Sequence, residues 1–232
     1  MAVEIEIDFD EPIPVFPLAQ LVLLPHATVP LQIFEPRYRA MTRHALEHDG
    51  LIAMGVLEGD HWMADDAGNP AIKPCVCVGR IVRHQELEDG RFHLLLQGLV
   101  RARMVEELPT DPEGYRSSML TPLEGEPAME IDLAGHREQL SALAHDDRLG
   151  KLAMMKQVRQ WLGSDLPTAA VLDVMALALC RDAGLRYAML AEPDAVTRAE
   201  RLIAHLESMR RTLDKAEPMA RHVKTDEGFF LN

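Results

Sequence analysis

The sequence predicts an α+β protein, with short strands and one helix in residues 1–124 and a helical bundle in residues 125–213. Prolines interrupt the apolar stretch near the start of the chain, which excludes a long helix there and leaves pieces of strand length. After the polar linker 121–130, apolar residues recur at the spacing of helices. Residues 214–232 carry no such pattern and are expected to form a loose tail.

The first elements are predicted from alternation and from the proline positions. Apolar and acidic residues alternate over residues 3–9, which indicates a strand. Two short apolar pieces between prolines, residues 21–24 and 29–34, are also predicted strands. A helix is predicted over residues 36–48, because Pro36 suits the first helical position and apolar residues then recur at helical spacing until a glycine stops them.

The remaining strands of the first half lie on either side of a turn signal. Strands are predicted over residues 51–57 and 75–83, the second with a bend or bulge at its glycine. The Glu-Asp-Gly sequence that ends at Gly90 is typical of a hairpin turn and leads into a strand over residues 91–97. After the next glycine a further strand continues to Val105.

Helical periodicity dominates the second half. Four helices are predicted, over residues 133–144, 149–162, 168–181 and 194–213. The third begins at Thr168, a good N-cap residue, and is apolar on every side, which predicts a place in the middle of the bundle. The fourth is apolar on one face and charged on the other.

Composition and charge restrict the functional classes. The chain has 232 residues, 47% of them hydrophobic and 26% charged, as in ordinary globular proteins. The net charge of −13 lies mostly in the first half and argues against nucleic-acid binding, which needs clustered Lys and Arg. No apolar run is long enough for a membrane span, and the acidic start lacks the apolar core of a signal peptide. Three cysteines, an odd number, do not indicate a disulfide framework, so we expect a cytoplasmic protein.

Several blocks of the sequence carry a family resemblance. They are Phe16-Pro17-Leu18, Leu24-Pro25, Pro30-Leu31 and, above all, Ile33-Phe34-Glu35-Pro36-Arg37-Tyr38-Arg39. These blocks resemble the amino-terminal, substrate-binding domain of the Lon protease family. Further matches are Val78-Gly79-Arg80-Ile81, Asp89-Gly90-Arg91 followed by Gly98 and Arg101, and Pro193-Asp194 followed by Arg198 and Arg201-Leu202.

The resemblance covers roughly residues 13–213 and implies an architecture. It implies an N-terminal PUA-like curved antiparallel β-barrel with one helix, followed by a C-terminal α-helical bundle. One departure is His26, where the family often carries glycine, so we expect a different turn there. The implied role is to bind polypeptide.

The catalytic modules of full-length Lon are not recognisable in this chain. The only Gly-Lys pair, Gly150-Lys151, lacks the earlier glycine and the following Ser or Thr of a phosphate-binding loop. None of the serines lies in a Gly-x-Ser-x-Gly motif. We therefore predict no catalytic residues, although a triad assembled from distant residues is not visible in a sequence.

Two residue patterns weakly indicate metal binding. His44 and His48 share a helix face, as zinc-binding pairs do, but a solvated polar face is the favoured interpretation. Cys75 and Cys77 could meet His84 or His93 across strands, but two buried thiols are the favoured interpretation. Neither signal predicts a metal or a cofactor.

Five residues are predicted to contact substrate. The motif contributes Phe34, Arg37 and Tyr38, for which a scaffold role at the helix start is the favoured alternative. Arg101 and Arg103 share one face of a strand in an otherwise acidic region. They are expected either to pair internally or to hold a carboxylate or an acidic peptide.

Three functions are compared. The leading hypothesis is a non-catalytic, stand-alone Lon-like module that binds unfolded or degron-bearing polypeptides and acts as an adaptor or regulator of an ATP-dependent protease. The alternative is a small-molecule-binding PUA-like protein or an uncharacterised hydrolase, which predicts a concave site with convergent polar groups. RNA binding by a PUA-like barrel is disfavoured by the acidic charge.

Overall fold

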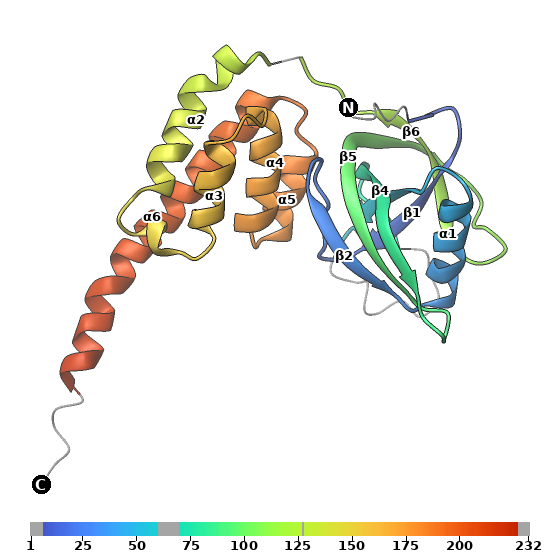
Figure 1. Ribbon diagram of the computed structural model, residues 1–232, viewed down its shortest axis with the longest axis horizontal. Helices are drawn as coiled ribbons and strands as arrows, with labels where there is room; N and C mark the ends of the chain where they lie inside the picture. The colour runs from blue at the N-terminus through green and yellow to red at the C-terminus, as the bar shows by residue number, and fades with distance from the viewer. Residues whose placement is uncertain (1–6, 60–69, 127, 227–232) are drawn as a thin grey trace, which may run out of the picture. The chain divides into compact units, whose positions relative to one another are not determined.

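The computed structural model describes residues 7–59, 70–126 and 128–226. They form two compact units (Figure 1). The sheet unit extends to Glu126 and also contains Cys180–Pro193, whereas the helical unit comprises the segment that ends at Leu179 and the residues from Asp194 onward. Residues 180–193, which we predicted to belong to the bundle, cluster with the sheet.

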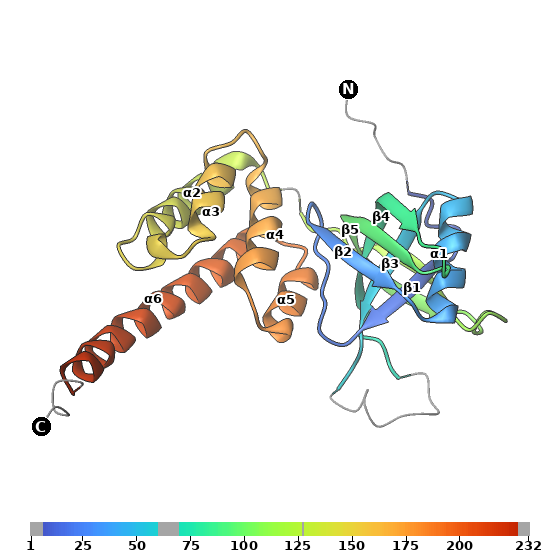
Figure 2. The same ribbon diagram turned by 60° about the horizontal axis from the view of Figure 1, so that its bottom comes forward.

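Six strands build the sheet unit. They are β1 (Ile13–Leu18), β2 (Thr28–Ile33), β3 (Leu51–Val56), β4 (Cys75–Glu86), β5 (Phe92–Glu107) and β6 (Arg116–Pro122). The strands pair in the order β2-β5-β4-β3-β1-β6, and β6 pairs again with β5. This second pairing closes a barrel, visible as a curved sheet in Figures 1 and 2. The 16-residue β5 pairs with β2 along its first half and with β6 along its second half.

One pairing departs from the predicted antiparallel barrel. β1 and β3 run parallel, in the register Val15↔Ala53 to Leu18↔Val56, while the other strand pairs are antiparallel. The chain forms β2 and a helix between these two strands, and such a crossover connection is what parallel strands need. Local sequence patterns carry no signal for this pairing.

The barrel interior is filled by aliphatic side chains. Seven of them form one buried cluster: Ile13, Val15, Ala53, Val76, Val78, Ala102 and Leu120. Ile7 and Phe9 pack against this cluster, although residues 7–9 are not a strand and the rest of the predicted strand 3–9 lies outside the described residues. Each fully buried aliphatic side chain contributes roughly 1.5–3 kcal/mol to folding.

The predicted strand over residues 21–24 is wrong. The segment pairs with no strand, yet Val22, Leu23 and Leu24 are fully buried. It crosses β5 at Gly98, where an added Cβ atom would lie 2.2 Å from the carbonyl oxygen of Leu24. Burial without alternation identifies a packed crossing segment, which a short apolar run cannot distinguish from a strand.

Helix α1 (Pro36–Glu47) follows β2 and packs against β1 and β3. Pro36 occupies the first turn, and the helix buries Tyr38, Met41 and Ala45 as the sequence predicts. The turn before β2 has a backbone conformation that glycine favours, because His26 has a φ of 63° in the left-handed region. Our expectation that this turn differs from that of the family stays a prediction.

Three elements of the sheet unit were not predicted. Strand β1 lies between the predicted strands, β6 closes the barrel, and helix α5 (Ala183–Leu190) is tied to β4 and β5. The Tyr187 hydroxyl accepts a hydrogen bond from the Cys75 N–H at 3.0 Å, and the Arg101 guanidinium donates to the Met189 carbonyl at 3.3 Å. These bonds explain why α5 clusters with the sheet.

The helical unit contains α2 (Glu130–Ala144), the 3-10 helix η2 (Leu149–Lys151), α3 (Met155–Leu162), α4 (Thr168–Leu179) and α6 (Ala195–Asp226). The single helix predicted over residues 149–162 is two helices. Helix α4 is buried on most sides, as its apolar composition predicts. Helix α6 is 32 residues long and passes through most of the segment that we expected to be a loose tail from residue 214.

Polar contacts fix the loop between α3 and α4. The Arg137 guanidinium donates to the carbonyls of Leu162, Ser164 and Leu166 at 3.0, 2.7 and 2.8 Å. The Glu130 carboxylate accepts from both the N–H and the hydroxyl of Thr168 at 2.7 Å. These bonds satisfy helix-end groups that would otherwise lack partners. Within the described ranges, none of the helices combines the length and apolarity needed to cross a bilayer.

Candidate functional site

The open edge of β2 is the candidate binding site, because among the described strands β2 pairs with β5 alone. Gly98 N–H donates to the Ala27 carbonyl at 2.8 Å, which makes residue 27 part of a hydrogen-bonded pair. Bonded and non-bonded pairs alternate along an antiparallel ladder, so the odd-numbered residues of β2 bond to β5. The backbone groups of three residues therefore point away from β5, toward the open edge: Thr28, Pro30 and Gln32.

The middle residue of this edge is a proline. Pro30 has no N–H, so the edge presents the N–H groups of Thr28 and Gln32 and the carbonyls of all three residues. Proline is tolerated in a sheet where its missing donor faces outward, which agrees with the register derived from Gly98. The interrupted donor row disfavours pairing between copies of this chain but still offers acceptors to an incoming strand.

Three cross-strand rows of side chains lie beside this edge on the outside of the barrel, and we call these three rows the outer face. The rows are Thr28–Gln97–Arg80, Pro30–Leu95–Arg83 and Gln32–His93–Gln85. The side chains alternate with buried ones along β2 and β5, which places them outside the barrel. None of these described residues is acidic, so the outer face differs in charge from the chain as a whole.

A shallow hollow of about 550 Å³ lies on this part of the sheet. Its lining residues are Arg83, His84, Gln85, His93, Leu94 and Leu95. Phe34 follows β2 directly and is 63% exposed, an unusual exposure for a large aromatic side chain. The edge therefore combines free backbone groups with apolar and cationic side chains.

The other two predicted motif residues serve mainly to build the helix start. The Arg37 guanidinium lies 2.9 Å from the Glu35 carboxylate and 4.6 Å from the centre of the Tyr38 ring. Tyr38 is buried against Phe16, with ring centres 4.5 Å apart, and burial raises the pKa of its hydroxyl. Of the three motif candidates, Phe34 and Arg37 are accessible to a partner, and their role in binding stays a prediction.

The predicted arginine pair lies elsewhere on β5, in the part covered by α5. Arg101 is buried and bonded to a carbonyl of α5, whereas Arg103 is exposed. Burial raises the pKa of the nearby Tyr187 hydroxyl to about 12, so this phenol stays neutral. The structure does not bring Arg101 and Arg103 together with Phe34, because Ile33 pairs with Phe92 at the start of β5 while Arg101 pairs with Cys77 much further along.

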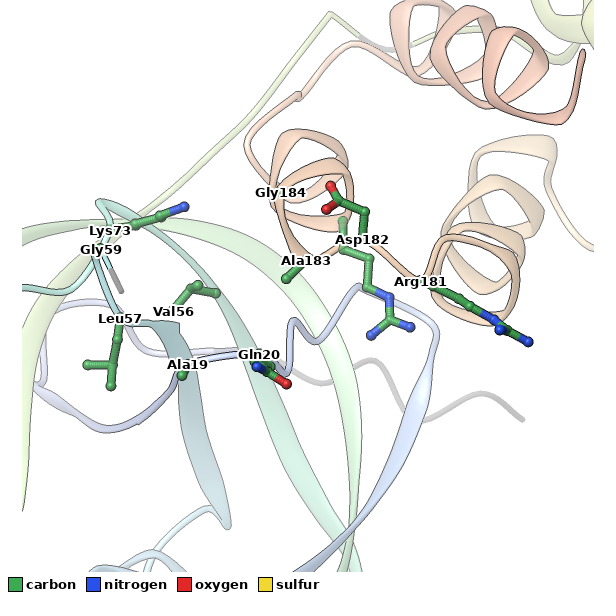
Figure 3. A pocket seen from close by; sticks show the side chains of 11 residues that line it. Ala19, Gln20, Val56, Leu57, Gly59, Lys73, Arg181, Asp182, Ala183 and Gly184 are labelled. Carbon is green, nitrogen blue, oxygen red and sulfur yellow. The ribbon is translucent and has the colours of Figure 1, made fainter. Parts of the chain in front are cut away.

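A second concave site lies beside the start of α5 (Figure 3). It has a volume of about 640 Å³. The loop after β1, the end of β3 and Lys73 form one wall, and the segment before α5 contributes Arg181 and Asp182 on the other (Figure 3). Arg186 completes the polar lining.

Neither pair of candidate metal ligands is joined by a third ligand among the described residues. His44 and His48 stack with ring centres 4.4 Å apart, and His48 Nδ1 lies 2.7 Å from the His44 carbonyl oxygen. Cys75 and Cys77 are buried thiols. Over residues 7–59, 70–126 and 128–226, no group of three or more His, Cys, Asp or Glu side chains is placed to hold a metal ion.

Sequence reasoning found the exposed aromatic but missed the edge and the α5 site. Pro30 inside an apolar strand was the available signal for an edge, because proline is confined to such positions. The α5 site depends on how residues 180–193 pack, and no periodic pattern indicates that packing.

The chain is similar to known Lon proteins over most of its length. The model of the ATP-dependent protease La (Lon) substrate-binding domain family matches residues 12–208. Lon protease of Chloroherpeton thalassium is 25% identical over 228 residues, which cover 97% of this chain and 26% of that protein. Lon protease of Parabacteroides distasonis is 31% identical over 112 residues, which cover 48% of this chain and 13% of that protein. The chain thus spans about a quarter or less of the length of these relatives.

Solved structures show the same fold. The N-terminal domain of a Mycobacterium avium complex Lon protease superposes with a TM-score of 0.65 at 15% identity, covering 85% of this chain and 98% of that one. A Lon N-terminal domain protein from Xanthomonas campestris gives a TM-score of 0.59 at 22% identity, with 84% and 98% covered. The predicted fold class, a barrel followed by a helical bundle, is confirmed.

Proposed function

Because this chain belongs to the family of Lon protease substrate-binding domains, we propose that it binds extended polypeptide segments along the open edge of β2 and carries out no chemistry of its own. The observation that carries the proposal is the unpaired side of β2, which presents backbone groups beside an exposed Phe34 and an uncharged stretch around Pro30. An added strand gains affinity from main-chain bonds and gains selectivity from alternate side chains.

The edge matches an unfolded client better than a folded one. Two N–H groups and three carbonyls are available on β2, and each hydrogen bond contributes about 0.5–1.5 kcal/mol net. Ordering the peptide offsets part of this gain, so we expect dissociation constants from about 10 μM to a few hundred micromolar. Folded proteins rarely present a free strand, whereas unfolded or degron-bearing segments do.

A proline substitution tests the edge directly. Gln32→Pro removes an N–H that points away from β5, so the ladder with β5 stays intact while an incoming strand loses a donor and meets the ring. We expect about tenfold weaker binding of a fluorescent unstructured apolar peptide, measured by anisotropy. Gln32→Ala keeps the N–H and serves as the matched control, with affinity close to that of the unchanged chain. Equal affinity of both variants would contradict the proposal.

We propose that the partner of this module is an ATP-dependent protease in the cytoplasm. The chain either delivers clients to this protease or competes with it for them. The test is degradation of an unfolded client by a purified Lon protease with increasing amounts of this chain. Delivery raises the degradation rate and competition lowers it, and Gln32→Pro should abolish either effect. An unchanged rate at saturating concentrations of this chain would refute the adaptor and regulator role.

A further inference from the structure

We propose that the pocket beside the start of α5 binds a small anion that carries two or more phosphate or carboxylate groups. This inference is independent of polypeptide binding at β2. The pocket has a volume of about 640 Å³, within the range of small-molecule sites. Among the residues that the structure describes, the titratable lining comprises Lys73, Arg181, Asp182 and Arg186, an excess of positive charge in a chain with a net charge of −13.

Among the described residues of this lining, the only carboxylate is already engaged. Asp182 Oδ1 accepts a hydrogen bond from Leu185 N–H at 2.7 Å and thereby caps α5. The carboxylate is therefore held at the helix start and does not neutralise the opposite wall. Among the residues that the structure describes, neither Lys73 nor Arg181 forms an ion pair with a carboxylate.

Two of the cations are held in place. Lys73 Nζ lies 4.6 Å from the centre of the Tyr187 ring, a cation–π contact that fixes the ammonium group on the wall formed by the barrel. The Arg186 Nε donates to the Cys180 carbonyl, which leaves its other N–H groups available for an anion. Arg181 is exposed, and its side chain extends away from the barrel wall, so it adds positive charge on the outer side of the segment before α5 (Figure 3).

The placement of the charges selects the class of ligand. Lys73 lies on the barrel wall, whereas Arg181 and Arg186 belong to the α5 side, so a single compact anion contacts one wall at a time (Figure 3). A molecule with two separated anionic groups reaches both walls. Gln20 at the rim offers an amide donor, and Val56 and Leu57 supply an apolar floor for the linking atoms of the ligand. Pyrophosphate and citrate are the simplest probes with this chemistry.

The test is isothermal titration of the full chain with pyrophosphate, citrate and inorganic phosphate at constant ionic strength. We expect dissociation constants on the order of 0.1 mM for pyrophosphate or citrate and at least tenfold weaker binding of phosphate. The double variant Lys73→Gln/Arg181→Gln should weaken pyrophosphate binding about tenfold. Arg91→Gln/Arg211→Gln removes the same charge from exposed ion pairs outside the pocket and should bind as the unchanged chain does.

Each outcome decides the proposal. Equal weakening of pyrophosphate binding in both double variants would mean that overall charge attracts the anion, and it would contradict binding in the pocket. If phosphate binds as tightly as pyrophosphate, the ligand does not need two separated anionic groups, which would contradict the proposed ligand class. Absence of binding at 5 mM anion would contradict the site altogether. Peptide binding that depends on Gln32 should be unaffected by pyrophosphate, so the two sites succeed or fail separately.

Discussion

Replacement of Gly98 by alanine should damage the crossing that holds β2 in position. An alanine Cβ atom would lie 2.2 Å from the Leu24 carbonyl oxygen and 2.9 Å from its carbonyl carbon, so the backbone of residues 24–27 must move. Two hydrogen bonds tie that backbone to Gly98, one from His26 N–H at 2.9 Å and one to the Ala27 carbonyl at 2.8 Å. Their loss costs about 2 kcal/mol, and overpacking adds roughly 1–3 kcal/mol.

We therefore expect Gly98→Ala to lower the free energy of opening of the β5 amides by about 3–5 kcal/mol. Hydrogen exchange with mass spectrometry measures this value separately for each unit of the chain. Gly135→Ala is the matched control, because no atom lies within 4 Å of the added Cβ in α2. That variant should stabilise α2 by about 0.5–1 kcal/mol. Unchanged β5 protection in Gly98→Ala would refute the close crossing.

Three further predictions concern the helical unit. Arg137→Lys should destabilise this unit by about 2 kcal/mol in thermal denaturation, because one ammonium cannot reach the carbonyls that the guanidinium fork holds; full stability would refute this role. Hydrogen bonds from Thr168 lower the pKa of the Glu130 carboxyl, so its stabilisation is complete above its ordinary value of 4.5 and is lost as the pH falls through the lowered pKa. In Glu130→Gln, the free energy of unfolding should therefore fall less steeply at acid pH. A fall equal to that of the unchanged chain would contradict this role of Glu130. Asp173→Ala leaves Arg198 buried without the carboxylate 3.6 Å away and should cost about 3–5 kcal/mol in urea denaturation, whereas a loss below about 1 kcal/mol would show that the pair is dispensable.

Elements with a strong local signal were predictable. Helix α1 was recognisable from Pro36 and from the helical spacing of its apolar residues, and α4 was recognisable from apolar residues on every side. Helix α6 extends past residue 213 through a segment that contains Pro218 and no apolar stripe, so neither propensity nor periodicity predicted the extension. Helical propensity acts locally, so it predicts an element better than it predicts where that element packs.

Features that depend on distant residues were not predictable. The parallel pairing of β1 with β3, the closure by β6 and the docking of α5 all arise from contacts between segments far apart in sequence. The burial of residues 21–24 requires Gly98, which is recognisable as a close approach only after the chain has folded. Hydrophobic periodicity carries no information about such pairings.

The candidate site was predictable in part. Phe34 was identified from the motif and is exposed beside the edge, while Tyr38 and Arg101 are buried and contribute to the scaffold. The open edge itself follows from the strand order, which the sequence does not contain. Pro30 gave the one local indication, since its missing N–H fits a strand with a free side.

The most direct test of the proposed function is the exchange rate of the Thr28 and Gln32 amide protons with and without a saturating unstructured peptide. Both N–H groups point away from β5 and should exchange rapidly in the free chain. Strand addition predicts that both become protected when peptide binds, while the already bonded odd-numbered amides of β2 change little. Saturable peptide binding without protection at these two positions would contradict docking at the edge of β2.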